Sequence, residues 1–165
     1  MFPHPHFGLF DIFNFYSNLT SFMPKKNTQI DLIIKHNFII LKKNIMENAK
    51  LLIQLILALG IYNVWIINYT KGSKYRGGSS TNMSEEFEAY GFKGWFMKII
   101  GFSKLTLGTL LIAGIWFPYL VEPSAFLIGT LMVGALFAHL KINDPFVKSI
   151  PALIMLILCS TLIIL

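Results

Sequence analysis

Residues 95–118 read WFMKIIGFSKLTLGTLLIAGIWFP, and two more apolar runs follow at once, 119–140 (YLVEPSAFLIGTLMVGALFAHL) and 147–165 (VKSIPALIMLILCSTLIIL). A fourth apolar run, residues 49–69, lies upstream. A helix needs roughly 20 apolar residues to cross a bilayer, and each run has about that length. The sequence therefore predicts an all-α, polytopic membrane protein built as a four-helix transmembrane bundle.

The composition supports a membrane protein. Hydrophobic residues make up 55% of the chain and charged residues 13%, and the mean hydropathy is +0.62. Soluble domains carry about 25% charged residues, so this chain has too little polar surface for one. The net charge of +6 is then best explained by Lys and Arg in cytoplasmic loops, and no basic helix points to nucleic acid. The single cysteine, Cys159, cannot form a disulfide, a redox pair or a zinc site.

Residues 1–45 differ from the rest of the chain. They have no clear period, no apolar run of membrane length and none of the features of a signal peptide. The segment 46–50 (MENAK) leads directly into the first apolar run, as a short native N-terminus does. We therefore expect a membrane domain at 46–165 that begins at Met46, with residues 1–45 as an extension that is not translated. The alternative is that residues 1–45 form a disordered cytoplasmic tail.

The connection at residues 70–94 is long and polar, and its glycine-rich first half predicts a flexible loop. Asn82 and Glu85 have the spacing of a capping box, and Gly91 follows as a helix terminator. Apolar residues lie on one face of the helix between them, at Met83, Phe87 and Tyr90. This pattern predicts a short amphipathic helix between the first two membrane helices, on the bilayer surface or against the mouth of the bundle.

The distribution of Lys and Arg predicts the orientation only if translation begins at Met46. The first and third loops then hold most of the positive residues, at Lys71, Lys74, Arg76, Lys93, Lys141 and Lys148. The positive-inside rule places these loops in the cytoplasm and both termini outside. If residues 1–45 are present, their five lysines balance the count and the rule predicts no orientation.

Lys104 lies near the middle of its apolar run, where a lysine costs on the order of 2.5–3.5 kcal/mol on insertion scales. Gly101 and Gly108 share its helix face, and small residues allow helices to approach closely. We therefore expect this face to point into the bundle. His139 lies near the end of the third run, and Gly134 and Ala138 give its helix another close-packing pattern.

These polar residues fall in the same half of the predicted bundle and can form one polar pocket. The candidate ligand-binding residues are Asn63, Lys104 and His139, with Glu85, Glu86, Glu88 and Tyr90 of the short helix as its roof. The other explanation is that they only hydrogen-bond neighbouring helices, at about 0.6 kcal/mol each. The pattern assigns no catalytic residue and no metal ligand.

Several motifs resemble the DoxX-like family of small bacterial membrane proteins. They are 86–91 (EFEAYG), 95–96 (WF), 100–104 (IGFSK), 108–114 (GTLLIAG), 131–140 (LMVGALFAHL) and 149–152 (SIPA). The resemblance covers residues 46–165 and implies a four-helix bundle in the bacterial cytoplasmic membrane. Two positions depart from it, because members often have Pro at Lys93 and many carry Glu near Lys104.

Most members of the family have no assigned activity, and the resemblance leaves two functions open. The first is a non-enzymatic accessory or small-molecule-binding module, which we favour. The second is a quinone- or quinol-linked oxidoreductase subunit, since some relatives are named for such complexes. The sequence has no haem ligand pair, dithiol, flavin or nicotinamide motif, so a redox role needs quinone itself or a membrane redox partner. A transporter of four helices would need to form a homo-oligomer.

Overall fold

The computed structural model describes residues 14–15, 17–18 and 28–165, and it contains no strand in these parts. The chain divides into two compact units, Met1–Ile45 and Met46–Leu165, and helix α2 (Thr28–Tyr62) belongs to both. Residues 28–45 are helical although their sequence shows no clear period. Most of the remaining extension lies outside the described residues, and the start at Met46 stays a prediction.

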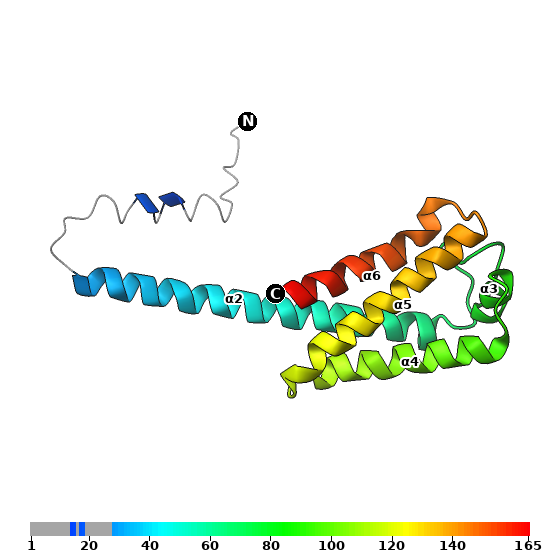
Figure 1. Ribbon diagram of the computed structural model, residues 1–165, viewed down its shortest axis with the longest axis horizontal. Helices are drawn as coiled ribbons and strands as arrows, with labels where there is room; N and C mark the ends of the chain where they lie inside the picture. The colour runs from blue at the N-terminus through cyan, green and yellow to red at the C-terminus, as the bar shows by residue number, and fades with distance from the viewer. Residues whose placement is uncertain (1–13, 16, 19–27) are drawn as a thin grey trace. The chain divides into compact units, whose positions relative to one another are not determined.

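After α2 the chain continues in a π-helical turn, Asn63–Ile67, and then forms the helices predicted from the sequence (Figure 1). These are α3 (Met83–Ala89), α4 (Gly94–Ala113), α5 (Val121–Lys141), which follows a 3-10 turn at Pro118–Leu120, and α6 (Phe146–Ile164). Among the described residues, four segments are long and apolar enough to cross a membrane: Gln29–Ile67, Gly94–Ala113, Pro118–Lys141 and Phe146–Ile164. The predicted all-α, four-helix membrane fold is confirmed, with α3 between the first two spans.

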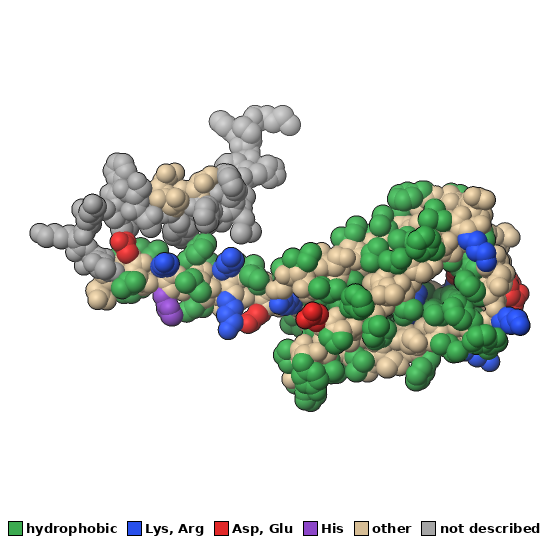
Figure 2. Space-filling view, in the orientation of Figure 1, with side chains coloured by type: hydrophobic (Ala, Val, Ile, Leu, Met, Phe, Trp, Pro, Cys, Tyr) green, Lys and Arg blue, Asp and Glu red, His purple; other side chains and the backbone are tan. Residues whose placement is uncertain are grey.

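Helices α5 and α6 form a hairpin, α4 packs beside α5, and α3 packs against α4 at one end of the bundle (Figure 1). The centre of the bundle is closed by the fully buried side chains of Leu57, Leu111, Ile128 and Cys159. Small residues permit close packing, as at Gly129, where a Cβ would lie 3.6 Å from Cys159 Cβ. On the face seen in Figure 2, hydrophobic side chains cover much of the bundle, and charged side chains appear at its α3 end and along the N-terminal part of α2.

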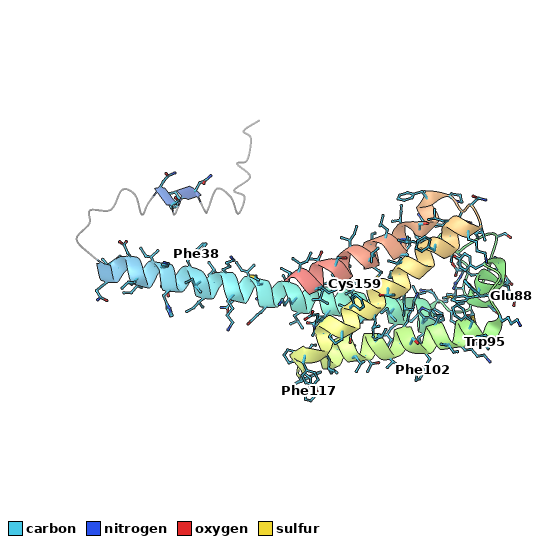
Figure 3. All side chains as sticks on the ribbon, in the orientation of Figure 1. Phe38, Glu88, Trp95, Phe102, Phe117 and Cys159 are labelled. Carbon is cyan, nitrogen blue, oxygen red and sulfur yellow. The ribbon has the colours of Figure 1, made fainter. Side chains whose placement is uncertain are left out.

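Aromatic side chains mark the two ends of α4. Trp95 is exposed at its first turn, and Trp116, Phe117 and Tyr119 are exposed just beyond its last turn. Figure 3 shows Trp95 and Phe117 at opposite ends of this helix. The 20 residues of α4 span about 30 Å, the thickness of the hydrocarbon layer, and Trp and Tyr prefer its two boundaries. Helix α3 therefore lies at one membrane surface.

Candidate functional site

Helix α3 begins at the predicted cap. Asn82 Oδ1 accepts a hydrogen bond from the Glu85 amide at 3.0 Å, and Glu85 Oε2 accepts from the Thr81 amide at 2.7 Å. The hydrogen bonds from the amide and hydroxyl of Thr81 hold the pKa of Glu85 below its usual range. Gly91, with φ of +81°, follows the helix. The capping interaction at Asn82 is confirmed. The exposed carboxylate of Glu85 takes part in the cap by accepting the hydrogen bond from Thr81.

Glu86 points to the other side of α3 and meets Arg76, the one arginine of the sequence. Arg76 Nη1 lies 2.7 Å from Glu86 Oε2, and the two side chains are 6% and 12% exposed. The guanidinium also donates to the carbonyls of Lys71 (2.9 Å) and Asn68 (2.5 Å). The Gly77 amide donates to the second oxygen of Glu86 at 2.9 Å. This buried ion pair therefore connects the loop that precedes α3 to the helix itself.

Tyr90 connects Glu86 to helix α5. Its hydroxyl donates to Glu86 Oε1 at 3.0 Å and lies 3.1 Å and 3.2 Å from the two ring nitrogens of His139. Burial, followed by the negative charge of Glu86, raises the pKa of Tyr90, so the hydroxyl keeps its proton. Gly77 has no side chain at this point, and a Cβ there would collide with the Tyr90 ring.

His139 continues the network to the loop between α5 and α6. Its Nδ1 lies 2.8 Å from Asp144 Oδ2, and Lys148 Nζ lies 3.1 Å from Asp144 Oδ1. The Gly78 amide also donates to Asp144 Oδ1 at 3.0 Å. Burial alone would raise the pKa of Asp144, but the hydrogen bonds from His139, Gly78 and Lys148 hold it below its usual range. An unbroken chain of polar contacts thus runs from Arg76 to Lys148.

The Asp144 contacts predict acid-sensitive stability. The folded-state pKa of Asp144 lies below the ordinary value of 3.8, so its contribution is complete above that value and is lost as the pH falls through the folded pKa. We expect unfolding in mild detergent to become easier as the pH falls from 5 towards 3, as read by circular dichroism. Asp144→Asn should be less stable at neutral pH and lose much of this pH dependence. Glu85→Gln measures the smaller contribution that the exposed cap of α3 makes to the pH dependence of stability, separately from that of Asp144.

A cavity of about 340 Å³ lies beside this network, between α5, α4, α3 and the end of the first span. In Figure 2 the surface is hollowed between α4 and α5, near α3. The wall of the cavity is mostly apolar and rich in aromatic side chains, which include Trp65, Phe87, Phe92 and Phe96. Its polar lining residues are Glu86, Tyr90, Lys104, Thr130 and His139. A largely apolar cavity with a few polar groups is typical of small-molecule sites.

Lys104 reaches this cavity from the helix face predicted for it. A Cβ on Gly101 would lie 2.5 Å from the Trp65 ring, and a Cβ on Gly108 would lie 3.6 Å from Ile61. This face of α4 therefore packs against the first span, as expected. Lys104 Nζ lies over the Trp65 ring, 5.6 Å from its centroid. Within the described part of the chain, no acid or hydrogen-bond acceptor contacts this ammonium group.

The structure brings together four of the seven candidate residues, Glu86, Tyr90, Lys104 and His139, on the cavity wall. Glu88 lies on the exposed side of α3 (Figure 3), and Glu85 serves the cap. Asn63 is exposed and accepts a hydrogen bond from Asn68 at 2.9 Å. These three residues do not line the cavity.

Sequence reasoning missed three important residues and misjudged one. Trp65 lies two positions after Asn63, on the opposite side of the helical turn, and it lines the cavity instead. Arg76 and Asp144 were not identified as partners of Glu86 and His139. Gly134 was expected at a close helix contact, but a Cβ there would meet open space, and Gly134 lines the cavity. Its missing side chain leaves room rather than bringing helices together.

Comparison with protein families matches residues 74–162 to the DoxX-like family. The chain belongs to the DoxX-like family. The segment matched to the DoxX-like family includes α3, α4, α5 and most of α6, and with them Glu86, Tyr90, Lys104 and His139. Trp65 lies before it. Comparisons with curated proteins and with solved structures give no match.

Proposed function

We propose that this DoxX-like protein is a non-enzymatic membrane module that binds a small molecule in the cavity beside α3. The observation that carries the proposal is the cavity itself, of about 340 Å³, with an aromatic wall and a few converging polar groups. Small-molecule sites in proteins begin at about 300 Å³ and share this mixture of surfaces. The family resemblance adds the bacterial cytoplasmic membrane as the proposed location.

Lys104 favours ligand binding over a purely structural role. Glu86 is matched by Arg76, and His139 by Asp144, so packing alone accounts for their placement. Lys104 faces the aromatic ring of Trp65 and the cavity. A lysine at membrane depth is costly unless it pairs with another group, and such residues commonly mark functional sites. A bound molecule would supply the missing partner.

The test is to purify the full chain in native lipid particles and identify co-purifying small molecules by mass spectrometry. We expect one compound to be enriched with the wild-type protein and lost from Lys104→Leu. Lys98→Leu is the matched control, because Lys98 is exposed on the same helix and does not line the cavity. Absence of any enriched compound, with Lys104→Leu folded as well as the wild type, would contradict the proposal.

A quinone- or quinol-linked oxidoreductase subunit is the second candidate function. The Lys104 ammonium is a hydrogen-bond donor on the wall of an aromatic cavity, and quinone carbonyls accept hydrogen bonds from such donors. Electron transfer would then need a redox partner in the membrane. In the same preparations, enrichment of a quinone that Lys104→Leu abolishes would favour this function over the first.

A further inference from the structure

The charged residues on the cavity wall differ in whether they have a partner of opposite charge. The Glu86 carboxylate is paired with the Arg76 guanidinium at 2.7 Å and accepts hydrogen bonds from the Gly77 amide and the Tyr90 hydroxyl. Its two oxygens thus already have three donors from the protein. Within the described residues, this acid makes no hydrogen bond or ion pair with Lys104.

The same holds at the His139 end of the wall. Asp144 accepts from His139, from Lys148 and from the Gly78 amide, so both of its oxygens have donors from the protein. Lys141 Nζ donates to the Tyr90 carbonyl at 2.8 Å and lies over the ring of the lining residue Phe92, adding another positive charge near the cavity wall. Neither acid is hydrogen-bonded or ion-paired to Lys104 in the part of the chain that the structure describes.

Lys104 is therefore the one charged lining residue without a polar partner in the described chain. Its Nζ lies 5.6 Å from the Trp65 ring centroid, a cation–π contact that leaves its three N–H groups without acceptors. An ammonium group in an apolar site is stabilised most by an anion that accepts a charge-assisted hydrogen bond. Phe87, Phe92 and Phe96 supply an apolar surface on the same wall for the rest of a ligand.

We propose that the cavity selects a hydrophobic carboxylate, with the carboxylate at Lys104 and the apolar body against the phenylalanine wall. This inference rests on the proposed function, since it names the chemical class of the ligand in the same cavity. Both ring-shaped and alkyl carboxylates carry this chemistry. The first can enter as free aromatic acids, and the second can come from the bilayer as fatty acids.

The test uses the full chain in nanodiscs of uncharged phosphatidylcholine, with binding measured by isothermal titration calorimetry. The probes are 1-naphthoate and dodecanoate, each paired with a neutral counterpart, 1-naphthamide and dodecanol. We expect one or both acids to bind more tightly than the neutral counterpart. Lys104→Gln should weaken binding of that acid by about 10- to 100-fold and leave the neutral probe unchanged. Whichever acid binds distinguishes the two sources.

Two further variants keep the test decisive. Lys98→Gln should bind the acid as the wild type does; an equal loss there would assign the effect to general membrane charge and overturn the inference. Gly134→Leu adds a side chain where the cavity is open, so it should weaken binding of the acid probe. This variant tests the cavity independently if Lys104→Gln folds poorly. Equal binding of acid and neutral probes would overturn the carboxylate inference and leave the proposed function standing. No binding of any probe, with no co-purifying compound, would overturn both.

Discussion

Replacing Arg76 with methionine is expected to lower the free energy of unfolding by about 3–5 kcal/mol, the usual cost of removing one partner of a buried ion pair. The Glu86 side chain is only 12% exposed, and the variant would leave its carboxylate without a counter-charge. It would also leave the Lys71 and Asn68 carbonyls without the guanidinium donors that fasten the loop. Equilibrium unfolding by SDS in mixed micelles, followed by circular dichroism, measures this change.

Two comparisons separate the ion pair from other effects of the loop. Lys74→Met removes an exposed charge of the same loop and should change stability by no more than about 0.5 kcal/mol. The double variant Arg76→Met, Glu86→Gln removes both charges together and should recover much of the loss, because no carboxylate remains unpaired. If Arg76→Met and Lys74→Met lose the same small amount, the buried pair does not hold α3 in place.

The features predicted correctly are those determined by short stretches of sequence. The length of the apolar runs gives the number of membrane helices, because the bilayer sets a fixed distance to cross. The spacing of Asn82 and Glu85 gives the start of α3, because a helix cap depends on residues three apart. Gly101 and Gly108 give the inward face of α4, because only small residues let the first span approach.

The features that sequence reasoning missed depend on contacts between distant segments. Arg76 follows Asn68 closely in sequence, yet its pairing with Glu86 depends on how the loop folds over α3. His139 finds Asp144 because the α5–α6 turn, with Asn143 at φ of 55°, brings the carboxylate back to the helix end. No local periodicity carries such information.

The cavity illustrates why polar residues alone were an incomplete guide. Asn63 was selected because it is polar in an apolar run, but in the structure it bonds to Asn68 at the exposed surface. The same turn directs the aromatic Trp65 into the cavity, where it supports Lys104. Small residues are equally ambiguous, because a glycine can serve a close contact, as Gly101 does, or leave open space, as Gly134 does.

This ambiguity leads to a paired prediction on the two glycines. Gly101→Ala is expected to destabilise the protein by about 1–3 kcal/mol, the cost of overpacking a filled interior. Its added Cβ would lie 2.5 Å from the Trp65 ring, so the ring must move or the two helices must separate. Gly134→Ala adds the same methyl group to a membrane helix where nothing lies within 4 Å. It should cost no stability and only reduce the cavity.

SDS unfolding of the two variants side by side measures the difference, since the chemical change is identical. A displaced Trp65 would also disturb the cation–π contact with Lys104, so Gly101→Ala should weaken ligand binding as well as stability. Adding Trp65→Leu to Gly101→Ala should restore part of the stability, because the smaller side chain makes room for the new methyl group, while ligand binding stays weak. Equal stability of Gly101→Ala and Gly134→Ala would mean that the first span does not pack against α4 at this point.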